Sequence, residues 1–181
     1  IKANPHGDAQ GLIEVEIASS ISCEAPSAVC ETPARKVDHD IPINSFQNRK
    51  YKQTWNQLSH DYESAKLYVT GDATESELRA SAKETIDRIN QSIGITKSDT
   101  VLEIGCGIGR IGRELASKCR KWIGCDISPN MLEYAGKRLS HLKNIELVEL
   151  PESNLSPIPD SSVDAVYCSV VFMHLDEWDR Y

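Results

Sequence analysis

Several common features are missing from this sequence of 181 residues, and each absence excludes a class of protein. No run of about 18 apolar residues occurs, so we expect no membrane span and no membrane partner. Basic residues are fewer than acidic ones, 20 against 27, which gives a formal net charge of −7 at pH 7. We therefore expect no nucleic-acid partner, although a local basic patch stays compatible with this charge.

Paired cysteines and a recognisable signal peptide are also missing. The sequence has six cysteines and no C-x-x-C pair: Cys23, Cys30, Cys106, Cys119, Cys125 and Cys168. Small buried thiols in a reducing compartment explain such residues, so we expect a cytoplasmic protein. No histidine or acid stands at ligand-like spacing from them, and we expect no metal site.

The first 45 residues differ from the rest in composition and pattern. They have scattered prolines and only one strand-like stretch, Leu12 to Ile17. We predict that residues 1–45 form a linker or the tail of a preceding region. Residues 46–181 then form the domain, with covering helices over residues 46–94 and a core over residues 95–181.

The first part of the domain is rich in aromatic residues. Between residues 46 and 70, apolar positions recur at helical spacing at Tyr51, Trp55, Leu58, Tyr62 and Ala65. Two interpretations stay open: a helix that packs on the core, or a lid over a ligand pocket. Thr74 and Glu77 form a capping-box pattern that begins a second helix, and Gly94 ends it.

Apolar runs alternate with helix patterns in the core. The runs cover residues 101–104, 121–126, 144–150 and 163–171. Helices are expected over residues 111–120, after the capping pair Ser128-Pro129, and from His174 onward. This order predicts an α/β fold: a Rossmann-like, doubly wound, mostly parallel sheet with helices on both faces. Because such sheets usually have more strands, we expect a sheet truncated after the fourth strand.

A glycine-rich turn follows the first strand and admits two interpretations. Gly107-x-Gly109-x-x-Gly112 fits the dinucleotide fingerprint, and Asp126 fits the acid that binds a ribose. Alternatively, Glu103 ends the strand and the turn begins immediately at Gly105. A buried carboxylate disfavours a pyrophosphate and suits a ligand with positively charged groups, so we favour the second interpretation.

In the second interpretation the sequence resembles the class I S-adenosylmethionine-dependent methyltransferases, in their small-molecule branch with a methyltransferase type 11-like domain. Four stretches follow the family's order, at residues 101–110, 125–132, 159–166 and 170–175. The resemblance implies S-adenosylmethionine as cofactor and a small-molecule methyl acceptor. Two alternatives stay open: an NAD-dependent oxidoreductase, and a non-catalytic cofactor-binding or interaction module with the same fold.

The resemblance also implies roles for single residues around the turn. Backbone groups of Gly105, Cys106 and Gly107 are expected to meet the methionine part of the cofactor. Glu103 is expected to orient the turn from below. Asp126 is expected to accept two hydrogen bonds from the ribose.

Further contacts are implied at the ends of the later strands. Ile127 and Met131 are expected to pack on the adenine, with ordinary core packing an alternative for Met131. Backbone atoms of Cys168 and Ser169 are expected to border the methyl group. For the adenine amino group, Glu152 and Asn154 are candidates.

The sequence does not settle the catalytic chemistry. His174, beside the end of the fourth strand, is a candidate general base, and His60 is a weaker one. Arg110 is expected to pair with a surface acid, or else with an acidic group of the substrate. Since the family's later strands do not follow in this sequence, we expect the isolated chain to be poorly stable and inactive.

Overall fold

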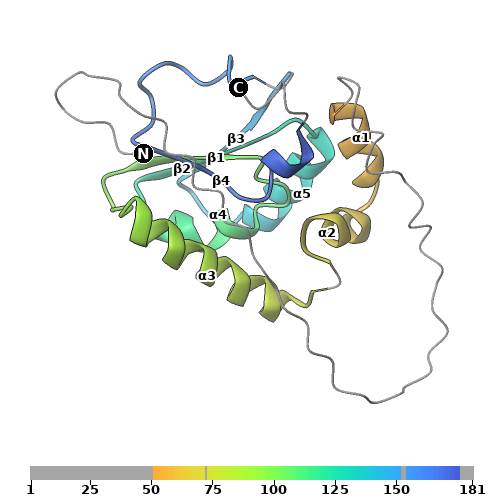
Figure 1. The fold of residues 1–181 in the computed structure, drawn as a ribbon, viewed down its shortest axis with the longest axis horizontal. Coiled ribbons are helices and arrows are strands. Elements are labelled where there is room, and N and C mark those ends of the chain that lie inside the picture. Colours follow the sequence, from red (N-terminus) through yellow and green to blue (C-terminus); the bar gives the residue numbers. More distant parts are fainter. Residues whose placement is uncertain (1–50, 72, 152–153, 176–181) are drawn as a thin grey trace.

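A computed structural model describes residues 51–71, 73–151 and 154–175. The predicted linker over residues 1–45, the strand-like Leu12–Ile17 and the residues after Leu175 lie outside this part. Four strands form one parallel sheet in the order β3-β2-β1-β4 (Figure 1). They are β1 (Thr100–Ile104), β2 (Lys121–Asp126), β3 (Ile145–Glu149) and β4 (Ala165–Cys168). The predicted parallel α/β architecture is confirmed.

Strand β4 is shorter than the apolar run over residues 163–171 suggests. It ends at Cys168. Val170, two residues later, has φ 61, in the left-handed region that no strand contains. The chain therefore turns across the edge of the sheet at Ser169–Val171 instead of continuing as a strand.

Helix α3 (Glu75–Ser92) begins at the predicted capping box, in which the Thr74 hydroxyl accepts from the Glu77 N–H. Helix α5 (Pro129–Leu139) begins after its predicted N-cap, Ser128, whose hydroxyl accepts from the Met131 N–H at 3.3 Å. The helix predicted over residues 111–120 is shorter in the structure. It comprises α4 (Arg110–Leu115) and a 3₁₀ turn, Ala116–Lys118.

The aromatic-rich segment forms two helices, α1 (Tyr51–Leu58) and α2 (Tyr62–Thr70), where the spacing suggested one. The break has a local cause, because the Asp61 side chain accepts from the Ser64 N–H and so begins a new helix. The helix predicted to begin at His174 is also different. A 3₁₀ turn, Phe172–His174, is present there, and residues after Leu175 lie outside the described part.

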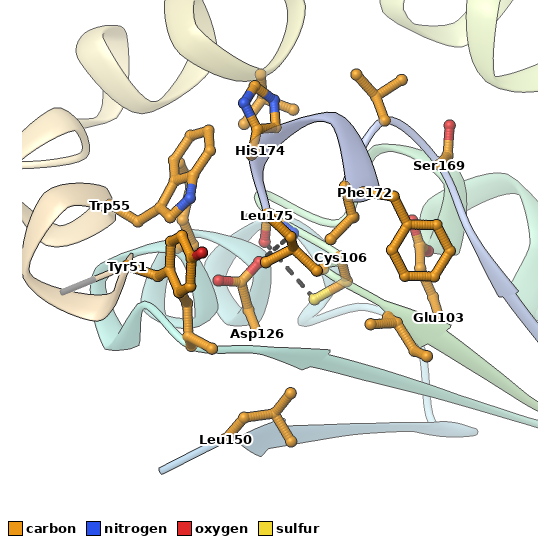
Figure 2. Close-up of a pocket in the computed structure, with 18 of the residues that line it drawn as sticks. Tyr51, Trp55, Glu103, Cys106, Asp126, Leu150, Ser169, Phe172, His174 and Leu175 are labelled. Atoms are coloured by element: carbon orange, nitrogen blue, oxygen red, sulfur yellow. Dashed lines mark hydrogen bonds between the residues drawn. The ribbon is translucent and has the colours of Figure 1, made fainter. Parts of the chain in front are cut away.

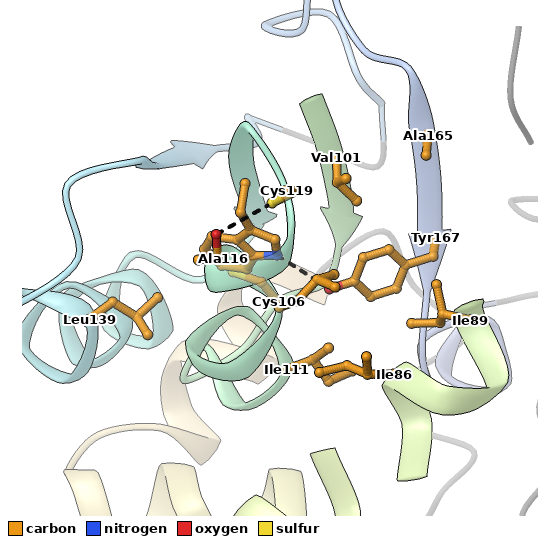
Figure 3. Packing of buried hydrophobic residues seen from close by; sticks show 12 residues of the cluster. Ile86, Ile89, Val101, Cys106, Ile111, Ala116, Cys119, Leu139, Ala165 and Tyr167 are labelled. Carbon is orange, nitrogen blue, oxygen red and sulfur yellow. Dashed lines mark hydrogen bonds between the residues drawn. The ribbon is translucent and has the colours of Figure 1, made fainter. Parts of the chain in front are cut away.

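Helices α3, α4 and α5 pack on one face of the sheet, and α1 and α2 lie beyond one of its edges (Figure 1). The main core joins α3 to strands β1 and β4: Ile86 and Ile89 pack with Val101 and Tyr167 (Figure 3). In the described residues, the opposite face is covered by the segment around Ile158 and not by a helix. We predicted helices on both faces of the sheet. In this part of the chain, helices cover one face only. No helix among the described residues is long and apolar enough to cross a membrane.

Candidate cofactor and acceptor pocket

A cavity of about 310 Å³ lies at the carboxyl ends of β1, β2 and β4. Parallel sheets bind ligands at this edge, because the loops that follow the strands meet there. Figure 2 shows Glu103, Cys106 and Asp126 low in the pocket, with Tyr51 and Trp55 of α1 on one side and Ser169 and Phe172 on the other. The pocket therefore brings together the turn, the two acids and the aromatic segment that the sequence singled out.

Glu103 lies at the base of the pocket and is only 3% exposed. The parallel register places it beside Tyr167 of β4, whose hydroxyl donates to the Glu103 Oε2 at 2.6 Å. Trp122 Nε1 in turn donates to the Tyr167 hydroxyl at 3.2 Å (Figure 3). Because an indole N–H can only donate, it leaves the Tyr167 proton for Glu103. Sequence reasoning missed this partner, which the pairing of β1 with β4 reveals.

Burial raises the pKa of Glu103 to about 7, and the Tyr167 hydrogen bond and the charge of Arg110 oppose this rise. Arg110 also lines the pocket, and its Nη1 donates to the Ser81 hydroxyl at 3.2 Å. Among the described residues we find no ion pair between Arg110 and a surface acid, contrary to our expectation. Its positive charge instead faces the buried Glu103.

The glycine turn has the shape that the sequence predicted. Gly105 and Gly107 have φ of 67 and 52, in the left-handed region. A side chain at Gly105 would collide with Val171, which packs over the turn. The Cys106 N–H, which we expected to face the ligand, instead donates to the Cys125 carbonyl at 3.0 Å.

Asp126 is buried and oriented by two backbone groups. The Gly107 N–H donates to Oδ2 at 2.8 Å and the Ser128 N–H donates to Oδ1 at 2.9 Å. The Gly107 N–H, like that of Cys106, is thus already engaged within the protein. Burial raises the pKa of Asp126, and these hydrogen bonds oppose the rise. Since each carboxylate oxygen has a second lone pair, Asp126 can still accept from a ligand diol.

Three of the remaining predicted cofactor residues line the pocket, and the side chain of the fourth does not. Ile127, Met131 and Ser169 line the pocket. Met131 also packs with Ala65 in a small core cluster, so both of its predicted roles are compatible with its position. The Cys168 side chain does not line the pocket, whereas the contact that we expected from Cys168 is one of its backbone atoms and stays a prediction. Cys168 pairs in register with Ile104 and, by strand alternation, lies on the opposite face from Tyr167.

Of the two histidine candidates, one lines the pocket and the other does not. His174 lines the pocket, and its ring contacts Trp55 edge to face, with centroids 5.1 Å apart. Burial lowers the pKa of His174, which favours the neutral imidazole. His60 is exposed, pairs with Asp61 at 2.9 Å and lies outside the pocket, so it is no longer a candidate.

Two candidates remain for the adenine end of the site. Asn154 lines the pocket, and its Oδ1 accepts from the Ser156 N–H at 3.0 Å. Glu152 lies outside the described residues. Among the described residues, no group of three or more histidine, cysteine, aspartate or glutamate side chains could hold a metal ion.

The aromatic segment is part of the pocket wall and not only of the core. Tyr51 and Trp55 from α1 and Tyr68 from α2 all line the cavity. Because Tyr51 and Ala65 are also buried in the core, both interpretations of this segment stay compatible with the geometry. Phe172, which follows β4, also lines the pocket and was not predicted as a site residue.

Comparison with known proteins gives consistent results. A family model described as a methyltransferase domain matches residues 102–181. An uncharacterized methyltransferase of Schizosaccharomyces pombe is 34% identical over 113 residues, which are 61% of this chain and 39% of that protein. A demethylmenaquinone methyltransferase of Tropheryma whipplei is 28% identical over 127 residues, 70% of this chain and 49% of that protein. A probable ribosomal RNA small subunit methyltransferase A of Methanosarcina acetivorans is 33% identical over 63 residues, which are 35% of this chain and 23% of that protein.

Among solved structures, a Haemonchus contortus phosphoethanolamine N-methyltransferase, in complex with phosphoethanolamine and S-adenosylhomocysteine, aligns with a TM-score of 0.57 and 26% identity. The alignment covers 76% of this chain and 27% of that one. The chain thus spans less than half the length of these relatives. The ordered motifs, the parallel sheet, and the turn and acids at its edge agree with these matches. These findings support a class I S-adenosylmethionine-dependent methyltransferase, and the family model itself matches residues 102–181, less than half of the chain.

Proposed function

We propose that this protein transfers a methyl group from S-adenosylmethionine to a small-molecule acceptor. The observation that carries the proposal is the convergence of Glu103, the Gly105–Gly107 turn and Asp126 on one cavity beneath an aromatic lid. A cavity of about 310 Å³ is at the lower end of the range for small-molecule sites.

The described residues fit the cofactor well. Asp126, fixed by two backbone N–H groups, would bind the ribose hydroxyls. Glu103 places an acid at the base of the pocket, where it favours a positively charged ligand. Ile127 and Leu150 would offer apolar surface to the adenine.

When bound, S-adenosylmethionine supplies a methyl group already activated by a positively charged sulfur. The acceptor would form the new bond to the methyl carbon with its own electron pair as the carbon–sulfur electrons return to sulfur, and it would release a proton from the attacking atom where that atom carries one. The chain's residues mainly position the two molecules and exclude water. His174, kept neutral by burial, is the candidate that would accept this proton where the acceptor requires it.

The small-molecule acceptor is supported by the charge of the pocket and by two of the relatives' names. Arg110 is the only lysine or arginine that lines it among the described residues, which leaves little to attract a phosphodiester backbone. Demethylmenaquinone and phosphoethanolamine methyltransferases both act on small molecules, whereas the shorter matches act on ribosomal RNA. RNA is therefore the second candidate acceptor.

Isothermal titration calorimetry tests the cofactor site. We expect S-adenosylhomocysteine to bind and NADH not to bind, and Asp126→Ala to weaken binding at least tenfold through loss of the ribose contacts. Asp160→Ala, at an exposed loop acid outside the pocket, is the matched control and should bind like the wild type. Tight binding of NADH would favour the oxidoreductase. Binding of S-adenosylhomocysteine without turnover on any acceptor would favour the non-catalytic module.

A further inference from the structure

Exposed apolar side chains gather at the mouth of the pocket. In the described part of the chain, five large apolar residues are exposed: Leu67, Tyr68, Leu155, Val170 and Met173. Of these, Tyr68, Leu155 and Val170 line the cavity, although they come from three separate segments. Single exposed apolar residues are common on proteins, but their convergence on one opening is typical of a binding site.

Val170 adds an independent observation. Its φ of 61 is strained for a β-branched residue, and the residue is 56% exposed, so little protein contact compensates the strain. The next residue, Val171, packs over Gly105 and fixes the turn against the floor of the site. The backbone thus keeps an apolar side chain at the opening in an unfavourable conformation, and such strain clusters at ligand sites.

The charges near the opening restrict what can bind there. Arg110, the one lysine or arginine of the described lining, donates to the Ser81 hydroxyl, and its charge acts on the buried Glu103. The mouth itself therefore offers no cation for a phosphate group in the described residues. Its neighbours are aromatic: Trp55 and His174 meet edge to face across the wall.

We propose that Tyr68, Leu155 and Val170 form the acceptor subsite, and that the acceptor is a neutral, apolar ring compound of the phenol or hydroquinone class. The apolar rim would cover the body of the ring, and the ring hydroxyl or an adjacent ring carbon supplies the electron pair for methyl transfer. This inference rests on the proposed function, because it assumes that the floor of the pocket holds the cofactor.

A fluorescence titration with 2-naphthol, in the presence of saturating S-adenosylhomocysteine, tests the subsite. We expect 2-naphthol to bind, and phosphoethanolamine and a short single-stranded RNA to bind more weakly. Val170→Asn is the sharpest variant, because asparagine tolerates left-handed φ while removing apolar surface. Its melting temperature should equal or exceed that of the wild type, yet its affinity for 2-naphthol should fall about five- to tenfold.

Leu155→Ser is a second variant in a different segment and should weaken 2-naphthol binding in the same direction. Leu67→Ser is the matched control: Leu67 is as exposed as Leu155, at 38% against 39%, but does not line the cavity. The affinity of the Leu67→Ser protein for 2-naphthol should equal that of the wild type.

The proposal is overturned if the loaded protein fails to bind 2-naphthol, if Val170→Asn binds it as tightly as the wild type, or if phosphoethanolamine or RNA binds more tightly. In each case the proposed methyl transfer still stands, provided that S-adenosylhomocysteine binds. If S-adenosylhomocysteine itself does not bind, the proposed function fails and the subsite assignment fails with it.

Discussion

Glu103 is an acid inside a buried strand, and its burial makes the ionised form unfavourable. Its pKa of about 7 in the folded protein compares with an ordinary value of 4.5. A raised acid pKa means that the folded state holds the proton more tightly than the unfolded state. The resulting stabilisation is complete below about pH 4.5 and is lost as the pH rises through about 7.

Glu103→Gln should remove this pH dependence, because glutamine has no proton to lose and its oxygen can still accept from Tyr167. Relative to the wild type, the variant's free energy of unfolding should rise by about 3 kcal/mol between pH 4.5 and 8. Urea denaturation over this range measures the difference. Glu146→Gln, at an exposed acid, is the control and should show no such trend. A constant difference for Glu103→Gln at all pH values would contradict the prediction.

Tyr167→Phe should also change the titration of the Glu103 carboxyl group, by removing its hydrogen-bond donor. The change removes the O–H that donates to Glu103 and leaves the Trp122 N–H without its acceptor, at a cost of about 1–3 kcal/mol in the free energy of unfolding. The titration midpoint of Glu103 should also move to a higher pH, because its carboxylate loses a donor.

The pH dependence of urea denaturation gives both results. Tyr134→Phe removes the hydroxyl of a partly buried tyrosine outside the pocket and should leave the midpoint unchanged. A Tyr167→Phe protein that loses stability without any shift of the midpoint would show that Tyr167 only packs.

At the scale of elements, α1 is joined to the loop after β2 through buried hydroxyls. The Ser128 hydroxyl donates to Asn56 Oδ1 at 2.7 Å and lies 3.1 Å from the Ser59 hydroxyl. Asn130 Nδ2 also donates to the Asn56 carbonyl at 3.1 Å. Because this loop begins with Asp126, the lid helix and the ribose-binding acid share one support.

Ser128→Ala should therefore loosen α1 as well as α5. It removes an N-cap, the contact with Asn56 of α1 and the contact with Ser59 just after α1, and should lower the free energy of unfolding by about 1–3 kcal/mol. Hydrogen exchange should become faster over Tyr51–Leu58. Ser140→Ala, at the exposed end of α5, is the control, with an expected effect within about 0.5 kcal/mol. Unchanged exchange in α1 would argue against the shared support.

A second connection between elements centres on Arg138 of α5. Its side chain is 5% exposed, donates through two nitrogens to Glu75 at 2.6 and 2.9 Å, and reaches the Tyr62 hydroxyl at 3.1 Å. Arg138 thus fastens α5 to the beginnings of both α2 and α3.

Arg138→Met keeps most of the apolar stem but removes this two-nitrogen contact, and should lower the free energy of unfolding by about 1–3 kcal/mol. Lys137→Met, which breaks an exposed pair with Glu133 and an exposed contact of the ammonium group with the Tyr134 ring, should change it by less than about 0.5 kcal/mol. Equal effects of the two substitutions in chemical denaturation would refute the difference in their roles.

At the scale of the whole molecule, the pocket is built from segments of α1, α2, β1, β2 and the turn after β4. A ligand that contacts all of them should stabilise the fold as a unit. S-adenosylhomocysteine at 100 times its dissociation constant should raise the free energy of unfolding by about 2.7 kcal/mol, and NADH at the same concentration should not. Thermal denaturation measures this, and a stabilisation by NADH alone would contradict it.

The sequence was sufficient for the parts of this molecule that depend on local patterns. The apolar runs and the glycine turn identified the sheet and its ligand edge, and the capping residues Thr74 and Ser128 located two helix starts. The break at Asp61 was missed because Tyr62 and Ala65 remain in helical phase with Tyr51, so the apolar periodicity continues through the gap.

Other features depend on contacts between distant segments and could not be predicted. The Tyr167 hydrogen bond requires the register of β4 against β1. The packing of Val171 over Gly105, next to the strained Val170, joins two segments that are far apart in the sequence.

Trp122 restricts which substitutions this protein can accept during evolution. Its ring occupies the space that side chains at Gly112 and Gly124 would need, and its N–H supports Tyr167. A larger residue at either glycine would displace the ring, whereas a smaller residue at position 122 would leave a void. The three positions should therefore covary among descendants of this sequence: relatives that have lost the tryptophan should be the ones that carry alanine or larger residues at the two glycine positions.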